Sequence, residues 1–211
     1  MGNSVEHLAK KFDLFILDWD GTILRLYTHV RLYGRLLSIL VKRKGQSKRY
    51  DSDFEPPEDL EAKENYIISS FLNFFVDKLS RPHLNYYVKE LLEELKRKHK
   101  KVAIMSNGNR YRILKKMEKA GLAEYFGMVV SAKDLHVAKP NPTGIKIVLK
   151  AFNEKPEKSI YIGDKTDDIM TAKYAKVSSC GIADGFDNYE KLKSVNPDYI
   201  FKNIKELCEA L

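Results

Sequence analysis

The sequence predicts an α/β protein with a Rossmann-like, open and mostly parallel sheet that has helices on both faces. Three observations lead to this fold class. Short apolar runs mark strands, apolar residues with helical spacing lie between these runs, and polar clusters follow several of the strands directly. In sheets of this kind, ligands bind outside the carboxyl ends of the strands. The polar clusters are therefore candidates for a functional site.

Five apolar runs are expected to form strands. They cover residues 14–17, 102–105, 128–130, 160–162 and 179–183. Between them, apolar residues recur at helical spacing over 87–95, 113–122 and 145–152. Strands that alternate with helices in this way are typical of a parallel sheet covered on both faces.

One long segment interrupts the alternation of strands and helices. Between Leu24 and about Pro82 no convincing strand is visible, and helical stretches run over 28–44 and 60–79. We therefore expect an α/β core domain of residues 1–24 and 83–211. A small all-helical cap domain of residues 25–82 would be inserted just after the first strand, over the sheet edge that carries the polar clusters.

The composition is that of a globular chain outside membranes. The 211 residues are 44% hydrophobic and 31% charged. The longest aliphatic cluster, 36–41, is too short to span a bilayer, and residues 1–12 lack the apolar region of a secretory signal. Cys180 and Cys208 have no metal-site spacing, which fits free thiols in a reducing compartment. We therefore expect a cytoplasmic protein without a membrane partner.

The charge balance allows anionic partners but does not select one. There are 37 basic and 29 acidic residues, a net charge of +8, and basic residues gather over 31–49 just before an acidic stretch at 51–61. A solvated and partly self-neutralising surface is the simpler interpretation. Aromatic residues are sparse in the basic stretch and no RNA-binding motif is present. Nucleic acid is therefore not an expected partner.

Asp18 and Asp20 follow the first predicted strand, in the string Asp-Trp-Asp-Gly-Thr. Two carboxylates in one turn repel each other unless they share a cation or a proton. An Asx-turn or a helix cap would also place an aspartate at a strand end. This string alone therefore does not decide between a structural turn and a site.

Ser106 and Asn107 end a second predicted strand, and Lys139 stands before Pro140 at the start of a helical stretch. Small hydroxyl and amide side chains often cap helices, and an isolated lysine is usually solvated. The same groups can donate hydrogen bonds and a point charge to a phosphoryl group. Both interpretations remain open for each residue taken alone.

Asp164, Asp167 and Asp168 lie within five residues, directly after a third predicted strand. Helix capping does not readily explain three carboxylates in so short a run. Mg²⁺ is bound by a few carboxylates and keeps water molecules and a substrate phosphate as its other ligands. The run therefore predicts a magnesium site.

Together these motifs resemble those of the haloacid dehalogenase superfamily, most closely its phosphoglycolate phosphatase-type branch with a helical cap. The matching motifs are Asp18-x-Asp20-Gly21-Thr22, Ser106, Lys139-Pro140 and Gly163-Asp164-x-x-x-Asp168, in the family's order. Segment 25–82 lies where this branch inserts its cap. The resemblance implies a Mg²⁺-dependent phosphatase that hydrolyses a small phosphorylated metabolite of the phosphoglycolate or sugar-phosphate type.

The resemblance also implies the catalytic and metal-binding roles. Asp18 would attack phosphorus and form an aspartyl-phosphate. Asp20 would protonate the leaving oxygen and then accept a proton from the hydrolytic water. Asp18, Asp164 and the backbone carbonyl of Asp20 would bind Mg²⁺, and Asp168 would bind it directly or through water.

The remaining matched residues would surround the phosphate. Ser106, Lys139 and the backbone N–H of Asn107 would hold the phosphoryl oxygens. Thr22 would support the loop after the first strand. Asp167 lies between matched positions and would be a bystander or a supporting group.

Two other enzymes of the same fold are alternatives. A phosphomutase also keeps Asp18 and Asp20 but returns the phosphoryl group to a sugar. The triplet 106–108, Ser-Asn-Gly, is familiar from the dehalogenases of this superfamily. Those enzymes attack carbon and need neither the second aspartate nor a metal. The presence of Asp20, with Asp164 and Asp168, therefore disfavours dehalogenation.

Overall fold

The computed structural model describes residues 7–25, 83–131, 135 and 138–211. The chain divides into two compact units, one formed by Met1–Arg25 and Leu84–Leu211 and the other by Leu26–His83. The predicted helical cap, apart from its first residue, lies outside the described residues. Its helical structure stays a prediction.

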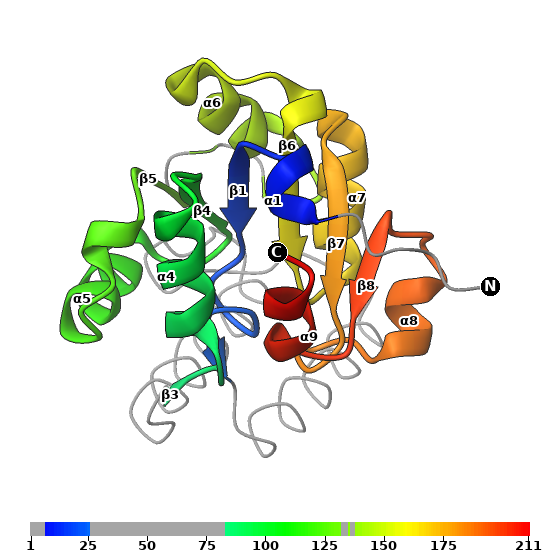
Figure 1. Cartoon of the computed structure of the whole chain (residues 1–211). Coiled ribbons are helices and arrows are strands. Elements are labelled where there is room, and N and C mark those ends of the chain that lie inside the picture. The colour runs from blue at the N-terminus through cyan, green and yellow to red at the C-terminus, as the bar shows by residue number, and fades with distance from the viewer. Residues whose placement is uncertain (1–6, 26–82, 132–134, 136–137) are drawn as a thin grey trace, which may run out of the picture. The chain divides into compact units, whose positions relative to one another are not determined.

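A six-stranded sheet with the order β5-β4-β1-β6-β7-β8 forms the centre of the first unit, and all its neighbouring strands are parallel (Figure 1). The strands are β1 (Leu14–Leu17), β4 (Lys101–Ser106), β5 (Met128–Ser131), β6 (Ser159–Gly163), β7 (Ser178–Ile182) and β8 (Tyr199–Phe201). Along the chain, strands are added first on one side of β1 and then on the other. The carboxyl end of β1 is therefore the switch point of the sheet, where open α/β sheets bind ligands.

Helices connect the strands and cover the sheet. They are α1 (Leu8–Lys11), α4 (Val88–Arg97), α5 (Arg110–Lys119), α6 (Thr143–Phe152), α7 (Thr166–Ala175), α8 (Tyr189–Lys193) and α9 (Ile204–Glu209). Helix α4 packs against α9, and α6 packs against α7. In the part of the chain that the structure describes, no helix has both the length and the apolar character needed to cross a bilayer.

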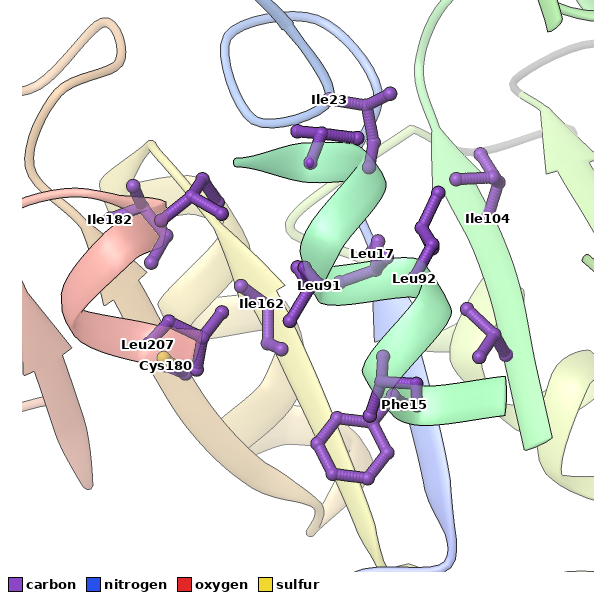
Figure 2. Packing of buried hydrophobic residues seen from close by; sticks show 14 of the residues in the cluster. Phe15, Leu17, Ile23, Leu91, Leu92, Ile104, Ile162, Cys180, Ile182 and Leu207 are labelled. Carbon is purple, nitrogen blue, oxygen red and sulfur yellow. The ribbon is translucent and has the colours of Figure 1, made fainter. Parts of the chain in front are cut away.

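Alternate side chains of β1 face two different cores. Phe15 and Leu17 belong to the core that also contains residues of α4 and α9, as Figure 2 shows. Leu14 and Ile16 belong to the core built with α6 and α7. All four side chains are fully buried. Because both faces of β1 are covered, every position of the strand is apolar, which explains the continuous apolar run in the sequence.

The five predicted strands correspond to β1, β4, β5, β6 and β7. Strand β8 was not predicted. It is a three-residue strand at the edge of the sheet, and its residues are only half-buried. Its short and partly exposed sequence therefore carries a weak periodic signal.

A separate two-stranded sheet, β2 (Leu24–Arg25) with β3 (His83–Leu84), joins the two ends of the segment 26–82. Asn85 strengthens this junction. Its backbone N–H donates to the carbonyl of Ile23 at 2.8 Å, and its buried Nδ2 donates to the carbonyl of Thr22 at 3.3 Å. The chain therefore leaves and re-enters the core at the loop that follows β1.

Candidate active site

Asp18 stands directly after β1 and is 2% exposed. Its backbone N–H donates to the carbonyl of Ile162 at 2.8 Å, which continues the pairing of β1 with β6. Its Oδ1 accepts a hydrogen bond from Lys139 Nζ at 2.7 Å. Burial raises the pKa of the Asp18 carboxyl, and the positive charge of Lys139 opposes this effect. The carboxylate is thus fixed at the switch point of the sheet and held by a cation.

Gly21 turns the chain back after Asp18 and Asp20. Its φ is +100°, in the region that favours glycine, and its N–H donates to the carbonyl of Leu24 at 2.8 Å. A Cβ atom at this position would overlap the carboxylate of Asp164. Glycine therefore allows both the backbone conformation and the close approach of the loops after β1 and β6.

Asp18, Asp164 and Asp168 form a buried cluster in which one carboxylate oxygen of each lies within 4.8 Å of the others. Oδ2 of Asp168 accepts the backbone N–H groups of Asp164 at 3.1 Å and of Lys165 at 2.9 Å. Asp164 Oδ2 accepts the N–H of Phe186. Its Oδ1 is buried and has no hydrogen-bond partner among the described residues. Burying a carboxylate oxygen without a partner costs free energy, and a bound divalent cation would supply that partner.

The charges in this cluster also favour a cation. Burial, and then the charges of Asp18 and Asp168, raise the pKa of Asp164 well above its ordinary value. Asp168 behaves differently. Burial by itself would raise the pKa of this carboxyl, but the charges and hydrogen bonds of Lys139 and Lys165 together outweigh burial and lower that pKa. The cluster holds three buried carboxylates, and the buried ammonium of Lys139 pairs with two of them, so a divalent cation would reduce the repulsion that remains. The residues present therefore fit the predicted Mg²⁺.

Lys139 connects the nucleophile candidate to the rest of the cluster. Its Nζ lies 2.7 Å from Asp18 Oδ1, 2.6 Å from Asp168 Oδ1 and 3.1 Å from the Tyr161 hydroxyl. An ammonium has three N–H donors, so these acceptors match its capacity. Burial by itself would lower the pKa of Lys139, but the charges of Asp168 and Asp18 hold that pKa well above its ordinary value. A phosphoryl oxygen would therefore have to share or replace one of these acceptors.

Ser106 and Asn107 lie where β4 ends. The Oγ of Ser106 is buried and accepts the backbone N–H of Gly108 at 3.1 Å. The Asn107 side chain accepts the backbone N–H of Lys139 at 3.0 Å through Oδ1. Asn107 thus positions the segment that carries Lys139, a role that its side chain had not been assigned from the sequence.

Asp20 is more open to solvent than Asp18. Its Oδ2 accepts a hydrogen bond from Nη2 of Arg112 at 2.8 Å, and the two side chains are 24% and 29% exposed. Arg112 lies in the first turn of α5, where Asn109 caps the helix by accepting the Arg112 backbone N–H at 3.1 Å. A Cβ at Gly108 would lie 3.1 Å from both charged groups. The ion pair therefore lies against the loop that follows β4.

Thr22 and Asp167 lie at the margins of the site. Thr22 is fully buried, and its hydroxyl oxygen has no hydrogen-bond partner within the described ranges. Asp167 is half-buried in the first turn of α7, and its carbonyl accepts the hydroxyl of Thr171. Their supporting roles stay predictions.

Besides Lys165 and Phe186, three residues that contact the site were not singled out from the sequence. One is Arg112, and the second is Tyr161, whose hydroxyl lies 2.9 Å from the Met105 carbonyl and 3.1 Å from Asp168 Oδ1. The third is Asp187, whose N–H donates to the Asp164 carbonyl at 3.1 Å. The hydroxyl of Tyr161 is a polar group within an otherwise apolar predicted strand, and this could have marked the residue as a candidate. No local signal marks Arg112, because its partner Asp20 is 92 positions away.

Known proteins share this sequence pattern. A family model for haloacid dehalogenase-like hydrolases matches residues 15–182. A phosphoglycolate phosphatase of Vibrio parahaemolyticus is 31% identical over 180 residues, which cover 85% of this chain and 74% of that protein. The pyrophosphatase PpaX of Oceanobacillus iheyensis is 27% identical over 152 residues, which cover 70% of this chain and 69% of that one.

Solved structures share the fold. A predicted phosphoglycolate phosphatase from Haemophilus somnus matches with a TM-score of 0.71 and 17% identity, over 94% of this chain and 97% of that one. A predicted phosphatase from Clostridium acetobutylicum matches with a TM-score of 0.72 and 21% identity, over 94% and 97%. The predicted fold class is confirmed, and so is the predicted class of enzyme, a hydrolase of the phosphatase type. The chain belongs to the haloacid dehalogenase-like hydrolases.

Proposed function

We propose that this chain is a Mg²⁺-dependent phosphatase that hydrolyses a small phosphorylated metabolite through an aspartyl-phosphate on Asp18. The observation that carries the proposal is the buried cluster of Asp18, Asp164 and Asp168 at the switch point of the sheet, with Lys139 hydrogen-bonded to Asp18 and Asp168. The relatives named phosphoglycolate phosphatase and pyrophosphatase support a small phosphate ester or anhydride as the substrate. Sugar phosphates belong to the same class of candidates.

Two transfers of the phosphoryl group complete the reaction. An oxygen of Asp18 bonds to phosphorus while the bond from phosphorus to the leaving oxygen breaks, and Asp20 gives that oxygen a proton. Asp20 then takes a proton from water as the water oxygen attacks phosphorus. Asp18 is released as a carboxylate together with inorganic phosphate. The hydrogen bond from Lys139 to Asp18 Oδ1 fixes the nucleophile, so little reorganisation is needed during attack.

Asp18, Asp164 and Asp168 would hold Mg²⁺, with the backbone carbonyl of Asp20 as a further ligand and Asp168 bound directly or through water. The ion would screen the Asp18 carboxylate from the negative charge of the substrate phosphate. The buried Oδ1 of Asp164 supports this assignment, because it has no other partner among the described residues.

The phosphoryl oxygens would be held by Ser106, Lys139 and the backbone N–H of Asn107. Thr22 and Asp167 would support the surrounding loops. The basic stretch 31–49, considered as a nucleic-acid surface, lies outside the described residues. The cytoplasmic location expected from the sequence stays a prediction.

Hydrolysis of p-nitrophenyl phosphate with and without Mg²⁺ tests the proposal. We expect Mg²⁺-dependent turnover that falls by about three orders of magnitude or more in Asp18→Asn. Asparagine keeps the size of the side chain and an acceptor for Lys139, so the variant should remain folded by circular dichroism. A folded wild-type protein that hydrolyses neither this substrate nor a broad panel of phosphate esters would refute the proposal. Interconversion of sugar phosphates faster than phosphate release would favour the phosphomutase alternative.

A further inference from the structure

Arg112 places a positive charge on the side of the site where the leaving group must lie. Its Nη2 donates to Asp20 Oδ2 at 2.8 Å. If Asp20 protonates the leaving oxygen, that oxygen lies within one hydrogen bond of Asp20. The guanidinium of Arg112 is then close to the first atoms of the leaving portion of the substrate.

The surroundings of Arg112 combine a fixed backbone with an accessible side chain. The Asn109 cap and the fully buried Ile113 hold the first turn of α5 in place. The side chain of Arg112 is 29% exposed, whereas that of Lys139 is 5% exposed. A guanidinium has five N–H donors in a planar fork, which suits carboxylate and phosphate groups. A group with this geometry can bind Asp20 and a second anion at the same time.

We propose that Arg112 determines specificity by binding a second anionic group on the leaving portion of the substrate. This inference rests on the proposed phosphatase function and narrows its substrate class. The preferred substrate is a phosphate ester or anhydride whose leaving portion carries a carboxylate or phosphate close to the leaving oxygen. A neutral leaving portion lacks this contact, and a positively charged one is repelled. The alternative is that Arg112 only holds the Asp20 carboxylate in place, which affects all substrates equally.

Three small substrates that differ in charge separate these roles. Phosphoglycolate carries a carboxylate, ethyl phosphate has a neutral leaving portion, and phosphoethanolamine carries an ammonium. We expect wild-type kcat/KM to fall in that order. Phosphoglycolate should exceed ethyl phosphate by about 10-fold or more, which is the factor expected for one charge-assisted hydrogen bond.

Substitution of Arg112 should remove this preference. In Arg112→Met, the ratio of kcat/KM for phosphoglycolate to kcat/KM for ethyl phosphate should fall to within about 3-fold of unity. The main cause should be a higher KM for phosphoglycolate. Any change in the position of Asp20 acts on both substrates and cancels in the ratio. Arg112→Gln serves as a second neutral variant, because glutamine can still donate a hydrogen bond to Asp20 and so is less disruptive to the fold.

Lys115→Met is the matched control. Lys115 lies on the same helix and is exposed, so this variant removes one positive charge away from the ion pair and should keep the wild-type ratio. A wild-type ratio near unity, or a ratio that survives in a folded Arg112→Met or Arg112→Gln protein, overturns the inference. Hydrolysis of p-nitrophenyl phosphate separates the two proposals. A folded wild type that hydrolyses neither it nor the broad panel of phosphate esters refutes the phosphatase function, whereas turnover with equal kcat/KM for phosphoglycolate and ethyl phosphate refutes only the role of Arg112.

Discussion

The two aspartates after β1 lie in very different environments although one residue separates them. Asp18 belongs to an inner half of the site, formed with Lys139, Asp164 and Asp168, in which every carboxylate side chain is buried. Asp20 belongs to an outer half, formed with Arg112, in which both side chains are partly exposed. Each half pairs negative with positive charge, but only the inner half does so away from water.

This difference in burial corresponds to two parts of the substrate: the phosphoryl group, which all substrates share, and the leaving portion, which differs between them. The inner half would contact the phosphoryl group and the metal, which every phosphate ester requires. The outer half would contact the leaving portion, which varies between substrates. Electrostatic interactions are stronger in the buried half, because water screens them less there. We therefore expect substitutions in the inner half to abolish activity and alter stability. Substitution of Arg112 in the outer half should instead change substrate preference with a small effect on stability, while Asp20 remains necessary for every substrate.

Lys139→Met should have the strongest combined effect. The substitution leaves Asp18 and Asp168 buried without their shared cation, and breaking a buried ion pair in this way destabilises proteins by about 3–5 kcal/mol. We expect kcat to fall by about 10²–10³-fold or more, because the Lys139 ammonium would also stabilise the charge that develops on the phosphoryl oxygens. Chemical denaturation and steady-state kinetics would measure both quantities.

Arg112→Met is the comparison for the outer half. Its ion pair with Asp20 is partly exposed, and such pairs contribute about 1 kcal/mol or less. A loss of stability in Arg112→Met as great as that in Lys139→Met would contradict the division of the site into two halves.

Asp164→Asn should increase the stability of the metal-free protein near neutral pH. The folded-state pKa of Asp164 is raised, so its stabilising contribution is complete below the ordinary pKa and is lost as pH rises through the raised value. Asparagine carries no charge, so it avoids the cost of burying one. At about pH 8 we expect the free energy of unfolding of the variant to be higher than that of the wild type by about 1–3 kcal/mol. Denaturation in EDTA from about pH 5 to about pH 8 would measure the difference, which should widen as pH rises.

Two observations would complete or contradict the prediction for Asp164. Asp168 has a lowered pKa, so its contribution is lost only as pH falls below the ordinary carboxylate range and does not affect this window. Added Mg²⁺ should stabilise the wild type by mass action and should leave Asp164→Asn almost unchanged. Equal stabilisation of both proteins by Mg²⁺ would argue against Asp164 as a ligand.

The sequence predicted the strand-end positions well, because apolar runs and a parallel sheet bring polar residues to one edge. It did not predict α7 as a helix, since its buried face includes Asp168, Thr171 and Ala172 and shows little apolar periodicity. It also missed contacts formed by tertiary packing. Arg112 meets Asp20 across 92 positions, and the Tyr161 hydroxyl meets the Met105 carbonyl across 56. Pairings over such distances follow from how helices dock on the sheet, which no local pattern encodes.

Tyr161 borders the inner half through Lys139, and Tyr161→Phe should have a milder effect than substitutions of the inner half itself. Burial and the charge of Asp168 raise the pKa of the Tyr161 phenol well above its ordinary value, so the hydroxyl keeps its proton at neutral pH and can donate to the Met105 carbonyl. The substitution leaves that carbonyl and one N–H of Lys139 without this partner, a loss of about 1–2 kcal/mol. Lys139 keeps both carboxylates, so we expect kcat to fall by only about 10-fold or less.

Tyr199→Phe is the matched control for Tyr161→Phe. Tyr199 lies in β8 at the far edge of the same sheet, and its hydroxyl accepts a hydrogen bond from Lys11 Nζ at 2.8 Å in an exposed setting. This variant removes the same oxygen without touching the carboxylate cluster, so kcat should be unchanged and stability should fall by less. If the two phenylalanine variants behave alike in both kcat and denaturation, the Tyr161 hydroxyl does not orient Lys139. If only Tyr161→Phe loses activity, the order of the inner half depends on the third acceptor of Lys139 as well as on its two carboxylates.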